Sequence, residues 1–216
     1  MLQDRRALEV YVVSWSTTAP GRDHVAILRA AIAGGASTVQ LRAPELQDDE
    51  LLTIAAELAS ACREARVLFL VNDRLDIAVA SGADGVHLGQ DDDARGARRR
   101  LGSDKVLGIS VGTSEEVHAA EAAGADYLGV TVWSTPTKPN AAPCGLEGLR
   151  AIMAATPLPV VGIGGIFATN AGLVLEAGAA GIAVISAVAS APDPVEATRA
   201  LVGVVRRFRE REGVAP

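Results

Sequence analysis

The chain has 216 residues, with 20 Lys and Arg against 26 Asp and Glu, which gives a formal net charge of −6. Hydrophobic residues make up 49% and charged residues 21%, a balance that excludes a disordered chain. The acidic balance argues against a nucleic-acid partner, because non-specific binding to nucleic acid needs a basic face. It leaves phosphorylated small molecules open, since local cations, a metal ion or backbone N–H groups can hold them.

Three further features bear on where the protein works. Its two cysteines, Cys62 and Cys144, are too few for a disulfide framework or a zinc site and indicate thiols in a reducing compartment. The first residues lack the apolar core of a signal peptide. Residues 151–175 carry no charge, but prolines and glycines would break them as a membrane-spanning helix. We therefore expect a cytoplasmic protein with no membrane partner, and whether it forms a homo-oligomer is left open.

A repeated phrase organises the chain: a helix ends, the backbone turns at Gly-Ala, and an apolar strand follows. Its four copies turn at Gly35, Gly82, Gly124 and Gly178. A glycine just past a helix end supplies the left-handed conformation that terminates the helix. The strands that follow are apolar throughout, as in a parallel sheet buried on both faces.

Taken in chain order, further apolar runs alternate with these four copies. The runs lie at 10–14, before the first copy, and then at 67–71, 106–110 and 159–164, each before the next copy. Helical patterns fill the gaps, at about residues 22–34, 48–65, 74–81, 92–101, 113–123, 146–155, 168–177 and 193–211. The chain thus predicts eight strands, each followed by a helix.

Eight alternating units imply right-handed βαβ connections and a parallel sheet. We predict an α/β fold in which residues 1–216 form a single (β/α)8 TIM-barrel domain. The alternative is a doubly wound open sheet, which a glycine-rich first strand–helix turn would favour. Residues 15–21 do not carry that fingerprint, so the barrel is preferred.

Carboxylates follow two neighbouring predicted strands, at the end of a barrel where chemistry takes place. Asp73 comes after the third strand, and the run Asp91–Asp93 comes after the fourth. Such oxygen ligands suit Mg²⁺, which is often held by one or two carboxylates. The run can equally cap the next helix, and one aspartate can cap while another binds metal.

Cations and amides gather at the same end of the predicted barrel. Arg42 follows the second strand and Lys138 lies beyond the sixth. Alone, each would be an ordinary surface charge, but together with nearby amides and hydroxyls they predict a polyphosphate pocket beside a metal; the neighbours are Gln40, Asn72, Thr135 and Thr137. By contrast, Arg95, Arg98, Arg99 and Arg100 lie inside a helix, where we expect a solvated face.

A second phosphate site is predicted after the last two strands. Gly162–Gly165 precede an expected helix start at residues 168–170, and Ile185 and Ser186 follow the eighth strand. In these barrels, backbone N–H groups at such positions bind phosphate, and glycine lets the backbone approach closely. A tight turn without a ligand is the alternative.

No obvious base or nucleophile accompanies these groups. The three histidines show no triad or metal-ligand spacing; we expect His87 to be a satisfied core residue and His118 to be exposed on a helix. No lysine ends a strand in the way a Schiff-base aldolase requires. A reaction in which metal and cations stabilise a departing pyrophosphate is therefore favoured over proton abstraction.

The order of these motifs resembles the thiamine-phosphate synthase (thiamine-phosphate pyrophosphorylase) family from about Val10 to Arg207. The matching motifs are Gln40–Arg42, Asn72–Asp76, Gly85–Gln90, Gly108–Ser110, Thr135–Lys138 and Gly162–Gly165. The resemblance implies a (β/α)8 barrel and a transferase that joins an aminopyrimidine diphosphate to a thiazole phosphate, giving thiamine phosphate and pyrophosphate. It also implies that pyrophosphate leaves first and that the thiazole nitrogen captures the pyrimidine cation.

The resemblance carries roles over to matching positions. Asp73 and Asp92 would hold Mg²⁺. The pyrimidine diphosphate would be surrounded by Gln40, Arg42, Asn72, Ser110 and Lys138, of which Arg42, Lys138 and Ser110 would be catalytic. The thiazole phosphate would be held by Thr135, Thr137, Gly165, Ile185 and Ser186.

One position departs from the family pattern. Two residues beyond Arg42 the family usually has a lysine, and this chain has Pro44. We hypothesise that Arg42, Lys138 and Mg²⁺ suffice. Two alternatives stay open: a thiazole tautomerase-like isomerase, which would have a histidine at Thr131 and lack the aspartate pair, and a non-catalytic phosphate-binding relative, for which Pro44 is the one hint.

Overall fold

Eight parallel strands pair in chain order, and β8 also pairs with β1, so the sheet closes into a barrel. The computed structural model describes residues 5–15, 22–134 and 142–213. The strands are β1 (Val10–Val13), β2 (Thr38–Leu41), β3 (Leu68–Asn72), β4 (Gly85–Leu88), β5 (Val106–Ser110), β6 (Tyr127–Thr131), β7 (Val160–Ile163) and β8 (Gly181–Val184). The predicted barrel is confirmed, and the open doubly wound sheet is wrong.

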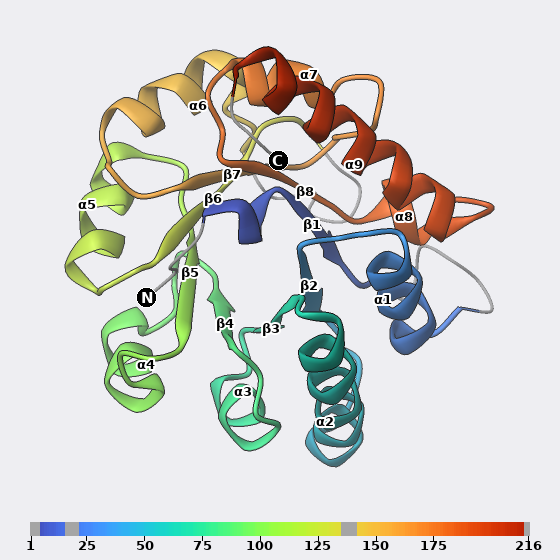
Figure 1. Ribbon diagram of the computed structural model, residues 1–216. Coiled ribbons are helices and arrows are strands. Elements are labelled where there is room, and N and C mark those ends of the chain that lie inside the picture. The colour runs from blue at the N-terminus through green and yellow to red at the C-terminus, as the bar shows by residue number, and fades with distance from the viewer. Residues whose placement is uncertain (1–4, 16–21, 135–141, 214–216) are drawn as a thin grey trace.

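Helices surround this barrel (Figure 1). They are α1 (His24–Ala33), α2 (Asp48–Ala65), α3 (Leu75–Ala80), α4 (Ala94–Leu101), α5 (Ser114–Ala122), α6 (Gly145–Ala154), α7 (Ala171–Glu176), α8 (Ser186–Ala189) and α9 (Pro194–Arg211). Two short elements are not predicted by the sequence pattern: α8 and the 3-10 helix η1 (Arg5–Leu8). Among the described residues no helix is long and apolar enough to cross a membrane.

The repeated Gly-Ala phrase acts as predicted. Gly35, Gly82, Gly124 and Gly178 have φ angles of 92°, 76°, 84° and 107°, all in the left-handed region that ends a helix. Each glycine is followed by a strand of the barrel. The phrase therefore marks four of the eight helix-to-strand turns.

Side chains alternate between two cores, one inside the barrel and one between the strands and the helices. On β1, Val10 and Val12 belong to the outer core, whereas Tyr11 and Val13 belong to the inner one. Leu8 of η1 joins the inner core, and its carbonyl lies so close to Gly181 that an added Cβ there would sit 1.8 Å from it. The amino-terminal end of the barrel is thus filled, and inward-facing residues at the other end are left to line a pocket.

Candidate active site

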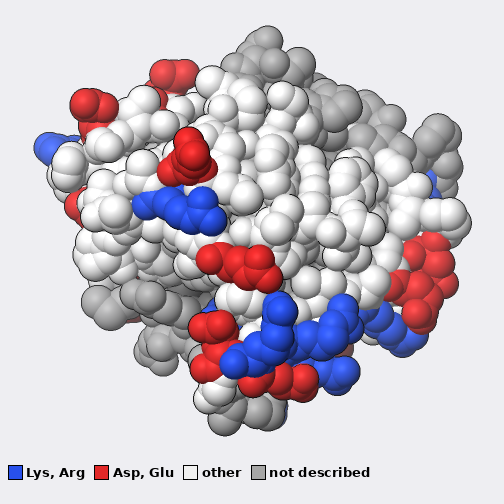
Figure 2. All heavy atoms as spheres, turned by 90° about the horizontal axis from the view of Figure 1, so that it is seen from above, with Lys and Arg blue, Asp and Glu red and all other residues white. Residues whose placement is uncertain are grey.

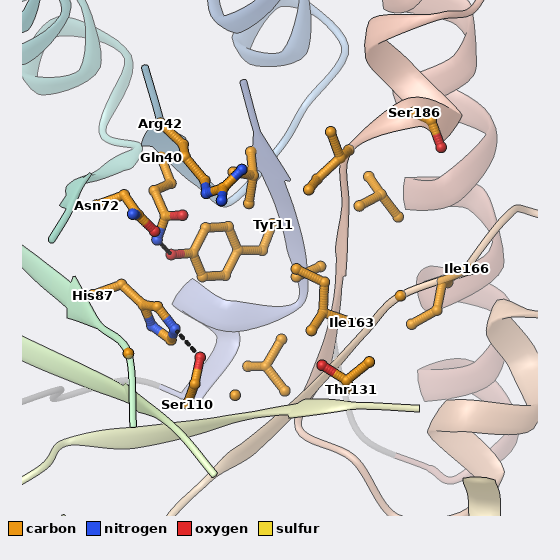
Figure 3. A pocket seen from close by; sticks show the side chains of 18 of the residues that line it. Tyr11, Gln40, Arg42, Asn72, His87, Ser110, Thr131, Ile163, Ile166 and Ser186 are labelled. Atoms are coloured by element: carbon orange, nitrogen blue, oxygen red, sulfur yellow. Dashed lines mark hydrogen bonds between the residues drawn. The ribbon is translucent and has the colours of Figure 1, made fainter. Parts of the chain in front are cut away.

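The pocket lies at the carboxyl ends of the strands and collects most of the predicted site residues. Gln40, Arg42, Asn72, Asp73 and Ser110 line it, together with the predicted phosphate-site residues Gly165, Ile185 and Ser186. Figure 3 shows Gln40, Arg42 and Asn72 on one side of the pocket and Ser186 on the other. The predicted Thr135, Thr137 and Lys138 lie outside the described residues.

Arg42 places an incompletely paired cation in this pocket. Its Nη1 is buried and has no hydrogen-bond partner within the part of the chain that the structure describes. Its guanidinium carbon lies 4.0 Å from the centre of the Trp15 ring. Burial lowers the pKa of Arg42, and the charges of Asp73 and Glu45 oppose that effect. A buried donor without a partner costs free energy, so this position favours an anionic ligand.

A chain of hydrogen bonds crosses the floor of the pocket. Gln40 Nε2 donates to the Tyr11 hydroxyl over 2.6 Å. The Tyr11 hydroxyl in turn lies 3.0 Å from the Tyr127 hydroxyl. The Tyr127 hydroxyl is 2.8 Å from His87 Nδ1, and His87 Nε2 is 3.0 Å from Ser110 Oγ. Burial raises the pKa of both tyrosines well above the ordinary value, so both hydroxyls keep their protons. We call these five residues the floor chain.

Two members of the floor chain, Tyr11 and Tyr127, are not predicted from the sequence, and a third, His87, is predicted only as a core residue. Tyr11 and Tyr127 do not lie at the carboxyl ends of their strands, and Tyr127 is the first residue of β6. His87 has both ring nitrogens hydrogen-bonded, as expected of a core residue, but it also lines the pocket. The signal was the two-residue alternation along each strand: His87 lies two positions before Gly89, and Tyr127 four before Thr131, on the same inward face. Space for the Tyr127 ring comes from Gly108, where a Cβ would lie 2.2 Å from that ring.

The two predicted metal ligands lie on neighbouring strand ends. Asp73 and Asp92 line one hollow between α3 and α4, and Asp73 also lines the main pocket. Asp73 has a φ of 59°, and its backbone N–H donates to the His87 carbonyl over 2.9 Å. Asp92 accepts from the Gly89 N–H over 2.7 Å. Among the described residues, no group of three or more metal-ligating side chains forms. Mg²⁺ is often held by only one or two carboxylates together with phosphate and water.

Another residue of the acidic run, Asp93, has a structural role. Asp93 caps α4, since its side chain accepts from the Gly96 N–H over 2.9 Å. The predicted solvated face of α4 holds for Arg95, Arg99 and Arg100, which are exposed. It is wrong for Arg98, which donates to the carbonyls of Gly102, Lys105 and Gly124 and pairs with Asp126. The sequence pattern missed this because its partners lie in two later turns.

The loop after β7 forms the opposite wall. Gly164 and Gly165 have φ angles of 90° and 63°, and a Cβ on Gly164 would lie 2.5 Å from the Trp133 carbonyl oxygen. Asn170 closes the loop, donating to the Gly165 carbonyl over 2.9 Å and accepting from the Phe167 N–H over 2.8 Å. The helix expected to start at 168–170 has Asn170 as its N-cap and begins at Ala171, and residues 168–170 form a turn.

The charge distribution on one face bears on partner class. Seen from above, Lys and Arg gather beside Asp and Glu along one edge, while most of the face is uncharged (Figure 2). Mixed charges of this kind do not make the broad basic surface that nucleic acid requires.

Comparison with known proteins gives consistent matches over nearly the whole chain. Residues 10–188 match the family model described as thiamine monophosphate synthase. The chain is 49% identical to the thiamine-phosphate synthase of Moorella thermoacetica, covering 93% of this chain and 97% of that protein. It is 47% identical to that of Natronomonas pharaonis, covering 96% of each. A solved structure of thiamine phosphate pyrophosphorylase from Pyrococcus furiosus superposes with a TM-score of 0.87 and 40% identity, covering 94% of this chain and 98% of that one.

Proposed function

The chain belongs to the thiamine monophosphate synthase family, and we propose how its pocket divides that reaction among residues. The enzyme joins 4-amino-2-methyl-5-hydroxymethylpyrimidine diphosphate to 4-methyl-5-(2-hydroxyethyl)thiazole phosphate. The bond between the pyrimidine methylene carbon and the diphosphate oxygen breaks, and its electron pair leaves with pyrophosphate. The thiazole nitrogen then supplies the pair for the new C–N bond, which gives thiamine phosphate.

The observation that carries the proposal is Arg42, which lines the pocket and whose buried Nη1 lacks a partner among the described residues. A diphosphate oxygen would satisfy it with a charge-assisted hydrogen bond. Such a bond grows stronger as negative charge collects on the departing pyrophosphate. Lys138, carried over from the family motif, would add a second cation to the same group.

Asp73 and Asp92 would hold Mg²⁺ on this side of the pocket, since two carboxylates on adjacent strand ends suit that ion. When bound, Mg²⁺ supplies positive charge that stabilises the leaving pyrophosphate. Asp73 and Arg42 line the same pocket, and the charge of Asp73 raises the pKa of Arg42 against the lowering effect of burial. The chain's own cation and metal ligands would therefore act on the same diphosphate.

Together with Asn72, the floor chain is suited to the aminopyrimidine. Gln40, Asn72 and Ser110 offer both donors and acceptors, as a ring with nitrogens and an amino group requires. Positive charge that develops as pyrophosphate leaves is shared with the ring's amino group. Acceptors such as the Ser110 hydroxyl, held by His87 over 3.0 Å, would stabilise that charge, and no general base is needed.

The opposite wall would take the thiazole phosphate. Gly165, Ile185 and Ser186 line the pocket there, with Thr135 and Thr137 proposed from the family motif. Gly164 and Gly165 have positive φ values and no side chains, so a phosphate there could approach the backbone closely. Cys62 and Cys144 are free thiols, which fits the cytoplasmic location we propose for the enzyme.

An assay of purified protein with both substrates tests this division. We expect Mg²⁺-dependent formation of thiamine phosphate, lost on chelation and lowered about 100-fold or more in Asp92→Asn. Lys138→Ala should impair the diphosphate step while leaving the affinity for thiazole phosphate nearly unchanged. Equal loss of both affinities by calorimetry would show that the two subsites are wrongly divided.

The same assay separates the two alternatives. An isomerase of the tautomerase type would keep its activity in chelator, and a binding protein would have no turnover to lose. Thr131 lines the pocket where the tautomerase alternative expects a histidine. A hydroxyl there is a poor general base at neutral pH, which favours the synthase.

A further inference from the structure

The segment that departs from the family pattern forms a tight turn. The Leu46 N–H donates to the Ala43 carbonyl over 3.2 Å, which places Pro44 second and Glu45 third in a β-turn. Proline favours the second position because its φ is fixed near the value that the turn needs. Pro44 thus replaces a flexible cation with a fixed turn, directly after Arg42.

That turn places Glu45 against a buried histidine. Glu45 Oε1 lies 2.7 Å from Nε2 of His24, the first residue of α1, which is only 4% exposed. His24 Nδ1 lies 2.9 Å from Oγ of Ser14, which is fully buried at the end of β1. The same Ser14 oxygen accepts a hydrogen bond from the backbone N–H of Arg42 over 3.1 Å. We call Ser14, His24 and Glu45 the Arg42 bracket.

The chemistry of the three side chains determines which atom donates and which accepts in each hydrogen bond of the Arg42 bracket. Glu45 presents a carboxylate, so His24 Nε2 carries the hydrogen and donates to it. In neutral His24 the other nitrogen then accepts the Ser14 hydroxyl hydrogen, which leaves a Ser14 lone pair for Arg42. This serine is no nucleophile, since it is buried and already engaged on both sides.

From these contacts we infer that Ser14, His24 and Glu45 are positioning residues, which hold the Arg42 backbone so that its guanidinium meets the diphosphate. The bracket ties the end of β1, the start of α1 and the turn after β2 to one residue of the pocket. Trp15, next to Ser14, stacks on the guanidinium itself at 4.0 Å. The inference rests on the proposed role of Arg42, and it explains how the chain manages with Pro44 in place of a lysine.

If Glu45 acts only through its charge, its removal should change anion binding in one direction. If Glu45 positions Arg42, the change should be in the opposite direction. Removing a negative charge near an anion site should by itself strengthen anion binding. If the bracket positions Arg42, Glu45→Ala should instead weaken it, whereas Glu45→Gln keeps an acceptor for His24 and should bind at least as well as the native enzyme. His24→Leu keeps most of the volume and removes both hydrogen bonds.

The experiment measures binding of inorganic pyrophosphate with Mg²⁺ by calorimetry, and KM for each substrate. We expect Glu45→Ala and His24→Leu to weaken pyrophosphate binding about three- to ten-fold, the size of one net hydrogen bond. KM for the pyrimidine diphosphate should rise with it, while KM for the thiazole phosphate stays unchanged. The matched control is Glu57→Gln, which breaks an exposed pair with Arg29 of α1 away from the pocket and should change nothing.

A double-mutant cycle with Arg42→Ala tests the role of Arg42 and the role of the Arg42 bracket separately. Arg42→Ala should weaken pyrophosphate binding about 10- to 100-fold, and Glu45→Ala should then add no further loss. If Arg42→Ala weakens binding but the bracket variants do not, the bracket is wrong and the proposed function stands. If Arg42→Ala leaves pyrophosphate binding unchanged, the proposed role of Arg42 fails, and the inference fails with it. Should His24→Leu not fold, the exposed Glu45 still decides the matter.

Discussion

Asp73 combines two demands at one position. Its carboxylate is a proposed Mg²⁺ ligand, and its backbone adopts a φ of 59°, in the left-handed region. Aspartate and asparagine tolerate this region better than other residues with a Cβ, because their short polar side chains can bond locally. The backbone conformation turns the chain from β3 into α3 and delivers the carboxylate to the pocket.

Two substitutions at Asp73 should therefore separate chemistry from conformation. Asp73→Asn and Asp73→Ala should both lower turnover, by about 100-fold or more, because each removes the charge. Only Asp73→Ala should also lower the free energy of unfolding, by about 1 kcal/mol, because alanine is disfavoured in the left-handed region. Urea denaturation checks the second effect, and equal stability of the two variants would contradict it.

Residue-scale prediction from sequence succeeds where the motif lies at a strand end and fails deeper in the barrel. Arg42, Asn72 and Ser110 all line the pocket as the strand ends indicate. The contact between Tyr11 and Tyr127 joins residues 116 positions apart in the chain. The closed barrel brings them together, and no local sequence pattern indicates the pairing. The same holds for His24 and Glu45, whose pairing depends on the turn that Pro44 fixes.

At the scale of elements, Arg98 connects α4 to the turns before β5 and β6. It donates to the carbonyls of Gly102 and Lys105 ahead of β5, and of Gly124 ahead of β6. Its partner Asp126 also accepts from the Leu107 N–H over 2.8 Å. These loops lie away from the pocket, so the contact is structural and should affect stability rather than turnover.

We expect Arg98→Met to lower the free energy of unfolding by about 3 kcal/mol, since it leaves a partly buried carboxylate and several carbonyls without their donor. Arg95→Met on the same helix is the control and should change stability by less than about 0.5 kcal/mol, because Arg95 is exposed. Thermal or urea unfolding measures both. Equal effects of the two variants would show that Arg98 is an ordinary surface residue.

The start of α5 gives an element whose stability should depend on pH. Thr113 and Glu116 form a capping box, and Glu116 Oε2 also accepts from the Gly112 N–H and from Gln90. Burial alone would raise the pKa of Glu116, but hydrogen bonds from Gln90, Gly112 and Thr113 outweigh it, and the pKa is lowered. The stabilisation is therefore complete above the unfolded pKa of about 4.3 and is lost as pH falls through the lower folded value.

Glu116→Ala should accordingly cost about 1 kcal/mol of unfolding free energy at pH 7, the size of a helix cap. The difference from the native enzyme should shrink as the pH is lowered below about 4, where the native carboxyl is protonated. Urea titrations at several pH values measure it. A difference that stays constant down to pH 3 would contradict the assignment of the charged carboxylate to the cap.

At the scale of the whole molecule, the fold was open to prediction because each βα unit repeats the same signals. Four glycine turns and eight apolar runs specify eight strands, and the closure of β1 on β8 follows from their number and length. The short helices η1 and α8 have too few residues to show the hydrophobic periodicity by which a helix is predicted from sequence. Their places depend on the closed barrel, which η1 fills at one end and α8 borders at the other.

The closed barrel also predicts how ligands should stabilise the enzyme. Arg42, Asp73 and Asp92 lie in the segments that follow β2, β3 and β4, so Mg²⁺ and pyrophosphate bound together would connect three neighbouring loops. A ligand at 100 times its Kd adds about 2.7 kcal/mol to the unfolding free energy. For a chain of this length that corresponds to a rise in Tm of about 5–10 °C.

Pyrophosphate without Mg²⁺ should give a much smaller rise, because two carboxylates would then face the anion uncompensated. Thermal melts of the native enzyme and Asp92→Asn measure this, the variant losing the Mg²⁺-dependent part. An equal rise with and without Mg²⁺ would place the metal elsewhere.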